Sequence, residues 1–354
     1  MLDLDRWEEI LATLRGNKVR TVLTALGVFW GLFMLTLMLG FGSGLEEGVR
    51  QNMRGLAANS FFIWGQRTSK PYAGLQAGRP IDFDNGDLEA VRRLPGIRYF
   101  APRNQLGGWR SGATVVHGTE AGSFSVMGDF PAIQYISPVE MVAGRFLNQL
   151  DIDERRKVAV IGRRVYETLF PGGQSAIGER IRIRGIDFSV VGVFDTLQQG
   201  GHAERKLSTV FVPFTTFQRV FGIGEKVGWF SVAARDDVDV EALEEAVRDL
   251  LKQRHKVAPD DEDAIGSWNA GREFGRIRGL FRGIRLFIWV VGLITLLAGV
   301  IGVSNIMLIV VKERTREIGI RKAVGATVAS IVGLVVQESV VLTTLAGCLG
   351  LLAG

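Results

Sequence analysis

Two long runs of uncharged, mostly apolar residues constrain this chain more than any other feature of its sequence. Residues 21–42 contain no charged side chain, and residues 286–311 form a second uncharged run of 26 positions. As a helix the first run is about 33 Å long, enough to cross the hydrocarbon core of a bilayer. A third apolar stretch runs from about Ala323 to Gly354 and is interrupted only by Gln337 and Glu338. It predicts a span at 328–354. The sequence therefore predicts an integral membrane protein with three visible transmembrane helices.

The first apolar run predicts a retained membrane span rather than a signal peptide. It is longer than a signal peptide's apolar region, and no small-residue cleavage site follows it. The only cysteine, Cys348, lies in the third apolar stretch, so no disulfide can form within the chain.

Basic residues beside the apolar runs predict how the chain crosses the membrane. Five of them follow the second span, namely Lys312, Arg314, Arg316, Arg321 and Lys322. Three precede the first span, namely Arg15, Lys18 and Arg20. Short basic segments of this kind are typical of cytoplasmic loops. We therefore expect the N-terminus and residues 312–327 in the cytoplasm and the 243-residue loop 43–285 outside it. Five arginines at 272–285 disagree with this orientation, but loops this long cross the membrane regardless of charge.

The long loop has the pattern of a folded α+β domain. A helix is expected to begin at Asp84 and to end at Pro95-Gly96. Alternating apolar and polar residues at 181–194 predict two strands that meet near Gly185. Further strands are expected at Lys157–Ile161 and at Thr209–Val212. A second amphipathic helix is expected at Val240–Leu251, capped by Asp237 or Asp239. Gly200-Gly201 is expected in a loop. Before the first span, residues 1–20 carry apolar residues at helical spacing, which predicts an amphipathic helix on the membrane surface.

Glycines recur every fourth residue where the chain leaves and re-enters the membrane. Such spacing keeps small residues near one side of a helix, so that a partner helix can approach closely. We expect stalk segments at 43–54 and 271–285, packed along Gly40, Gly44, Gly48, Gly271, Gly275, Gly279 and Gly283. The alternative is that these glycines only loosen the segments, since each costs a helix about 1 kcal/mol relative to alanine.

The motifs of an enzyme do not occur in the sequence. No phosphate-binding loop of the form G-x-x-x-x-G-K-[ST] occurs, so we expect no ATP hydrolysis by that route. The three histidines are far apart and have no metal-ligand spacing. The basic residues are explained by the membrane and need no nucleic acid. We therefore expect a non-catalytic chain without a metal.

The run ERTREIGIRKAVGA, Glu313–Ala326, directly follows the second span. It resembles the cytoplasmic loop of FtsX/MacB-type ABC transporter permeases. LRGNKVRTVLTALGVFWG resembles the entry into that family's first helix, and VAVIGRRVYETLFPGG and IGERIRIRGIDFSVVGVF resemble the extracytoplasmic domain of its MacB-like members. The resemblance covers essentially the whole chain.

The resemblance implies that this loop carries a coupling helix that docks on a separate ATPase subunit. Charges of both signs would steer and register such a surface, and the isoleucines would anchor it. The implied contact residues are Glu313, Arg314, Arg316, Glu317, Ile318, Ile320, Arg321 and Lys322. A loop that only binds lipid headgroups would explain the arginines but not the two glutamates.

Glu338 is an acidic residue within the third apolar stretch, where the family often has a glutamate. A carboxylate in a membrane is costly and is usually paired or functional. We expect it near the cytoplasmic surface, paired with Lys18 or Arg20, in preference to a proton relay.

The implied function is that of a MacB-type permease in the bacterial inner membrane. Its partners would be the ATPase that binds ATP and magnesium, a second permease chain in a homodimer, membrane lipid, a periplasmic adaptor and an outer-membrane duct. It would drive efflux of an antibiotic, peptide or similar cargo. A Lol-like permease that extracts lipoproteins, an FtsX-like transmitter that regulates an extracytoplasmic enzyme, and an anchored receptor without an ATPase are the alternatives. The family has four transmembrane helices, so about one more helix is expected beyond the three visible ones.

Overall fold

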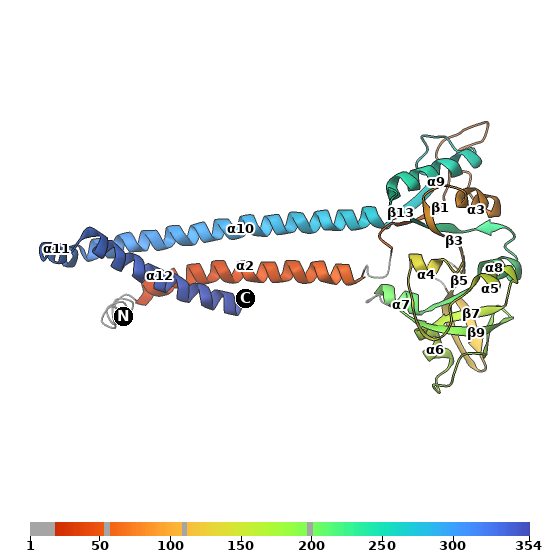
Figure 1. Cartoon of the computed structure of the whole chain (residues 1–354), viewed down its shortest axis with the longest axis horizontal. Helices are drawn as coiled ribbons and strands as arrows, with labels where there is room; N and C mark the ends of the chain where they lie inside the picture. Colours follow the sequence, from red (N-terminus) through yellow and green to blue (C-terminus); the bar gives the residue numbers. More distant parts are fainter. Residues whose placement is uncertain (1–17, 53–56, 108–111, 197–200) are drawn as a thin grey trace. The chain divides into compact units, whose positions relative to one another are not determined.

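The computed structural model describes residues 18–52, 57–107, 112–196 and 201–354 (Figure 1). Most of the predicted amphipathic helix at 1–20 lies outside the described residues. The chain divides into two compact units, which are described separately. The membrane unit comprises Met1–Gly48 and Arg278–Gly354, and the loop domain comprises Val49–Ile277.

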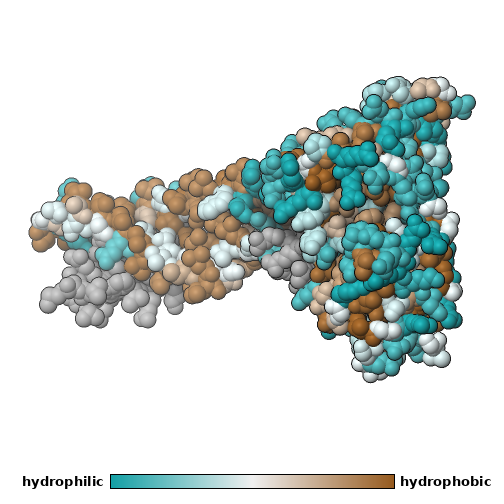
Figure 2. Space-filling model, turned by 45° about the vertical axis from the view of Figure 1, so that its right-hand side comes forward, coloured by the Kyte–Doolittle hydropathy of each residue, from teal (hydrophilic) through white to brown (hydrophobic). Residues whose placement is uncertain are grey.

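The membrane unit is helical. Its helices are α2 (Lys18–Asn52), α10 (Ala270–Glu313), α11 (Thr315–Ala323) and α12 (Val328–Ala353), of which the ends of α2 and α10 reach into the loop domain. Helices α2, α10 and α12 are long and apolar enough to cross a membrane. Much of their visible surface is apolar (Figure 2). The prediction of three apolar helices with an α+β domain between the first two is confirmed.

Six strands of the loop domain close into a ring. In ring order they are β10 (Thr209–Pro213), β7 (Val158–Gly162), β9 (Ile186–Asp195), β8 (Arg180–Ile183), β4 (Ala113–His117) and β5 (Glu120–Asp129). The ring closes because β10 pairs with both β7 and β5. Inward-facing residues such as Ile161, Phe188 and Val210 are fully buried in its core. Closure leaves these strands without the free edges that promote aggregation.

The sheet continues from β5 as four antiparallel strands. They are β3 (Ile97–Leu106), β12 (Trp229–Ala234), β1 (Ser60–Gly65) and β13 (Ile265–Asn269). Two helices, α3 (Asn85–Arg92) and α9 (Val240–Arg254), cover this part with buried residues such as Val91 and Val247, which share a core with Phe61 and Phe230. The smaller elements are β2 (Phe83–Asp84), β6 (Glu140–Gly144), β11 (Lys226–Val227), α4 (Ile133–Ile136), α5 (Gln149–Asp153), α6 (Arg163–Leu169), α7 (Gly201–Leu207) and α8 (Phe214–Val220).

Local sequence signals account for several of these boundaries. Asp84 caps α3 and forms a reciprocal capping box with Asp87, which satisfies backbone N–H groups that the first turn leaves free. Asp239, one of the two expected residues, caps α9. The turn between β8 and β9 holds Gly185 at φ 82° and Arg184 at φ 48°, as a tight hairpin requires. Gly201, expected in a loop, instead begins α7.

A buried ion pair joins the ring to the open part of the sheet. Arg103 on β3 donates to both carboxylate oxygens of Asp129 on β5, at 2.7 and 2.8 Å. The Asp129 side chain is completely buried. Burial raises the pKa of Asp129 to about 6, although Arg103 acts in the opposite direction. The link between the two parts of the domain therefore contains a charge that is costly to bury.

Candidate functional site

The residues predicted to contact an ATPase lie on and beside α11, the short helix between the second and third apolar helices. Glu313 ends α10, and Arg314 precedes α11. Most of the set is exposed, and α11 buries none of its side chains: Arg316, Glu317, Arg321 and Lys322 are exposed, whereas Arg314 and Ile318 are half-buried. A helix that leaves its surface open in this way is available to a partner.

The turn after α11 sends the chain directly back toward the third apolar helix. Gly325 has φ 101°, which favours glycine, and follows the last residues of α11. The Ala326 N–H donates to the Arg321 carbonyl at 3.0 Å, and the Gly325 N–H donates to the Lys322 carbonyl at 3.2 Å. These two bonds make a Schellman motif. The Thr327 side chain then accepts from the Ser330 N–H and caps α12. The turn that separates α11 from α12 is therefore encoded in the sequence VGAT, residues 324–327.

Helical spacing separates the two isoleucines that were expected to anchor a partner. Ile318 and Ile320 are two residues apart, which places them on different sides of α11. Ile320 instead shares a side with Val324, four residues on, and the two are 58% and 84% exposed. Val324 was not predicted, although its i+4 spacing from Ile320 could have identified it. An exposed apolar pair beside Arg316, Glu317 and Arg321 is a suitable docking surface.

The other end of α10 is anchored to the loop domain by a buried carboxylate. Asn269 accepts a hydrogen bond from the Arg272 N–H at 3.0 Å and so caps α10. Glu244 of α9 is 2% exposed, and its Oε2 accepts from Asn269 Nδ2 at 2.7 Å and from Arg272 at 3.2 Å. Its Oε1 accepts from Arg248 and Ser267. This network, which we call the α10 anchor, connects α9, β13 and the first turn of α10. Sequence reasoning missed it, because its members lie far apart in the chain.

Glycines bring the three apolar helices of the membrane unit into close contact. A Cβ atom at Gly350 of α12 would lie 2.6 Å from the Phe29 carbonyl oxygen of α2. A Cβ atom at Gly31 of α2 would lie 3.2 Å from the Thr295 side chain of α10. Substitution at Gly350 therefore requires the backbone of a neighbouring helix to move.

The glycines predicted to pack along a stalk have different surroundings. Among the described residues, a Cβ atom at Gly40, Gly44, Gly48, Gly275, Gly279 or Gly283 would meet no neighbouring heavy atom within 4 Å. At Gly271 it would lie 3.0 Å from the Ala58 carbonyl oxygen. The two helices of one chain therefore do not pack along the first six glycines. Packing against a second chain stays a prediction.

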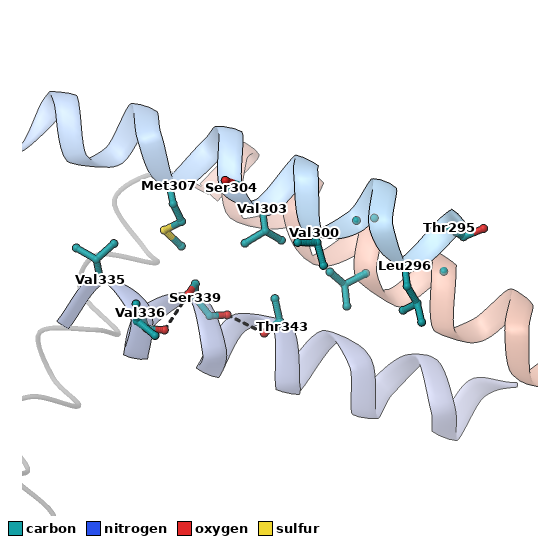
Figure 3. Close-up of a pocket in the computed structure, with 14 residues that line it drawn as sticks. Thr295, Leu296, Val300, Val303, Ser304, Met307, Val335, Val336, Ser339 and Thr343 are labelled. Carbon is teal, nitrogen blue, oxygen red and sulfur yellow. Dashed lines mark hydrogen bonds between the residues drawn. The ribbon is translucent and has the colours of Figure 1, made fainter. Parts of the chain in front are cut away.

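An apolar cavity of about 410 Å³ lies among α2, α10 and α12 (Figure 3). Val300, Val303 and Met307 line it from α10, and Val335 and Val336 line it from α12. Its hydroxyl groups bond within their own helices, as in the 2.8 Å bonds from Ser339 to the Val336 carbonyl and from Thr343 to the Ser339 carbonyl. The cavity suits an apolar side chain or an acyl chain.

Two further residues considered from the sequence, Glu338 and His255, lie apart from the residues of α11. The Glu338 side chain lies outside the described residues, as do those of Lys18 and Arg20, so their pairing stays a prediction. His255 and Arg254 donate to Asp87 at 2.7 and 2.6 Å. Burial alone would raise the pKa of Asp87, but these hydrogen bonds hold it below its ordinary value. Among the described residues, no three His, Cys, Asp or Glu side chains could together hold a metal ion.

Comparisons with known proteins match both units of the chain. The MacB-like periplasmic core domain model matches residues 21–250, and the FtsX-like permease C-terminal model matches residues 289–354. The macrolide export ATP-binding/permease protein MacB of Bdellovibrio bacteriovorus is 28% identical over 344 residues, which cover 97% of this chain and 52% of that protein. The pyoverdine export ATP-binding/permease protein PvdT of Pseudomonas putida is 32% identical over 336 residues, which cover 95% and 49%. The chain thus spans about half the length of these relatives.

A solved structure shows the same fold in the loop domain. The periplasmic region of MacB from Actinobacillus actinomycetemcomitans aligns with a TM-score of 0.51 at 18% identity, over 64% of this chain and 96% of that one. The loop domain therefore has the fold of a periplasmic core domain, and the chain is a multi-pass membrane protein. From its two matched regions and its apolar helices, this chain belongs to the MacB/FtsX family of ABC transporter permeases.

Proposed function

We propose that this chain is the permease subunit of a MacB-type exporter and transmits the motion of an ATPase to its periplasmic domain. The proposal rests on α10, a single 44-residue helix that begins at the α10 anchor and ends at Glu313, beside α11. At 1.5 Å per residue such a helix is about 66 Å long. A displacement of α11 would therefore act on one continuous helix, whose first turn is hydrogen-bonded to Asn269 of β13 and Glu244 of α9.

The ATPase would dock on α11 and bind ATP and magnesium. Its contact residues would be the predicted set at 313–322 with the addition of Val324. Ile320 and Val324 would be covered by apolar residues of the ATPase, and the surrounding charges would set the register. The N-terminus and α11 would then face the cytoplasm. Two copies of this chain would be needed to engage a pair of ATPases.

The names of the relatives, which describe export of a macrolide and of pyoverdine, support a proposal for the cargo class. We propose efflux of an antibiotic, peptide or siderophore-like molecule from the periplasmic side, with a periplasmic adaptor and an outer-membrane duct as further partners. The extraction of lipoproteins and the regulation of a periplasmic enzyme are the competing outcomes.

Co-purification of an ATPase with the full-length protein from native membranes tests the docking surface. Exchange of charge in Arg316→Glu with Glu317→Arg, and loss of apolar surface in Ile320→Ser with Val324→Ser, should each remove most of the bound ATPase. Truncation of a central apolar anchor typically costs an interface about 1–3 kcal/mol.

The matched control is Val328→Ser, because Val328 is 63% exposed but lies on α12, beyond the Schellman turn. It should retain the ATPase. If wild-type protein binds no ATPase in the presence of nucleotide, the permease function fails and an anchored receptor becomes the better interpretation. If both α11 variants retain the ATPase, the docking surface lies elsewhere.

A further inference from the structure

Three arginines and a tryptophan form a line along one side of α10, next to its apolar span. Arg278, Arg282, Arg285 and Trp289 are spaced four, three and four residues apart. This spacing keeps side chains on one face of a helix. All four belong to the membrane unit and are exposed. We call this line the arginine stripe. The docking of an ATPase on α11 does not explain it, because the stripe lies at the opposite end of the span.

Among the described residues, a single ion pair compensates the positive charge of the stripe. Arg285 pairs with Glu46 of α2 at 2.6 Å, and both side chains remain accessible, at 61% and 41% exposure. Among the described residues, no carboxylate lies within 4 Å of the guanidinium nitrogens of Arg278 or Arg282. The segment 49–56 contributes no acid, because its sequence is VRQNMRGL. The stripe therefore presents two guanidinium groups without a counter-charge beside a third that has one.

The other two arginines at this end of α10 differ in their contacts. Arg272 is part of the α10 anchor and pairs with Glu244 at 3.2 Å. Arg276 lies 3.9 Å from Glu273, one turn away on the same helix. Both have carboxylate partners in the loop domain, where they belong by position. The difference shows that the stripe is not simply a continuation of a paired, solvated charged surface.

The position of the stripe corresponds to the headgroup layer of a membrane. The uncharged span begins at Leu286, directly after Arg285. Trp289 is 57% exposed, and exposed tryptophans are enriched at the membrane–water interface. At 1.5 Å per residue, Arg285, Arg282 and Arg278 lie about 6, 10 and 16 Å beyond Trp289 along the helix. Headgroup layers are about 5–8 Å thick on each side, so Arg285 and Arg282 lie at the height of phosphate groups, and the long side chain of Arg278 can extend back toward them.

We propose that the arginine stripe binds the phosphate of an anionic phospholipid in the leaflet next to the loop domain. A planar guanidinium group matches two phosphate oxygens with two parallel N–H donors, and two such groups one turn apart can clamp one phosphate. Trp289 would lie against the glycerol and upper acyl region. The site explains why basic residues are concentrated on the side of the membrane that the positive-inside rule would leave less basic. It is independent of the ATPase and of the cargo.

Native mass spectrometry of the full chain in detergent measures this preference directly. Phosphatidylglycerol and phosphatidylcholine with identical dioleoyl chains are titrated separately, so that only the headgroup differs. Wild-type protein should bind its first phosphatidylglycerol about ten-fold more tightly than phosphatidylcholine, since each surface arginine favours an anionic lipid by several-fold. Arg278→Gln with Arg282→Gln should reduce this ratio below about three-fold. Arg276→Gln removes the same type of charge from another side of the same helix and should leave the ratio unchanged.

Three results would overturn the proposal. An unchanged ratio in the double variant would show that the stripe does not select the headgroup. Displacement of the lipid preference by an equal concentration of glycerol phosphate would make a soluble phosphate the ligand instead of a lipid. A double variant that keeps the preference but loses its dimer would assign the arginines to carboxylates of a second chain. Because both side chains are exposed, the double variant should remain folded. A circular dichroism spectrum identical to that of the wild type verifies that a lost preference does not result from unfolding.

Discussion

Glu244 of α9 and Arg272 of α10 are joined by a 3.2 Å ion pair in which the carboxylate is 2% exposed and the guanidinium is 42% exposed. The same carboxylate holds Asn269, which caps α10. A buried acid thus ties the first turn of the longest helix to the domain that this helix would move.

The first prediction concerns the α10 anchor. Glu244→Ala leaves Asn269 and the two arginines without their shared acceptor, and loss of one partner of a buried pair costs about 3–5 kcal/mol. Because Arg272 and Arg248 are partly exposed, we expect the lower end of this range. The free energy of unfolding of the loop domain measures it. Transport should fall while ATPase binding persists.

Glu245→Ala serves as the control, since Glu245 is the exposed neighbour of Glu244 on α9. It should change stability by less than about 0.5 kcal/mol. Equal effects of the two substitutions would mean that helix content, and not the anchor, determines stability.

The second prediction is a pH dependence from Asp129. Its folded pKa of about 6 lies above the ordinary value of 3.8. Between these values the folded state holds a proton that the unfolded state has released, so stability falls as pH rises from about 4 to about 6 and is constant above. The contribution is at most about 3 kcal/mol. Asp129→Asn cannot titrate, so its stability should lack this decrease.

Urea unfolding of wild type and Asp129→Asn at pH 4.5 and pH 7.5 measures the difference. The wild type should lose stability relative to the variant at the higher pH. A relative gain at pH 7.5 would instead show that Arg103 lowers the pKa of Asp129 in the folded protein.

The third prediction tests the contact between α12 and α2. Gly350→Ala places a methyl group 2.6 Å from the Phe29 carbonyl oxygen, so the helices must separate. Alanine otherwise stabilises a helix by up to about 1 kcal/mol relative to glycine. We expect a lower thermal unfolding temperature in lipid nanodiscs.

Gly333→Ala is the matched control on α12, because its Cβ atom would meet no described neighbour within 4 Å. It should leave the unfolding temperature unchanged or raise it. A Gly350→Ala protein as stable as Gly333→Ala would show that α12 can move away from α2 without cost.

The fourth prediction concerns the stalk glycines, which have room around them in a single chain. If a second chain packs along them, Gly275→Leu with Gly279→Leu should weaken the dimer, whereas the corresponding alanine pair should have a smaller effect. Analytical ultracentrifugation in detergent distinguishes the two. Dimers of unchanged strength in the leucine variant would assign these glycines to helix flexibility alone.

The membrane class and many local elements could be predicted from the amino-acid sequence alone. Uncharged runs as long as a bilayer core is thick predict spans, and a helix satisfies its own backbone hydrogen bonds in lipid. The capping residues Asp84 and Asp239 and the turn at Gly185 act through neighbours a few residues away, so their positions could be predicted. The resemblance of Glu313–Ala326 to the family's cytoplasmic loop implied the short helix α11, and the glycine that ends this helix, Gly325, is a local signal.

Contacts between residues far apart in the chain could not be predicted in this way and became visible in the folded structure. The strand β10 closes the ring by pairing with β5, about 80 residues earlier, and no local pattern encodes that partner. Glu244 finds Asn269 and Arg272 because α9, β13 and α10 converge, and a glutamate in an amphipathic helix is usually solvated. The every-fourth-residue spacing predicted close packing at six glycines that meet no neighbour within 4 Å among the described residues, whereas Gly31 and Gly350 touch neighbouring helices. Contact between distant residues depends on how whole elements pack, and that information is spread over the entire sequence.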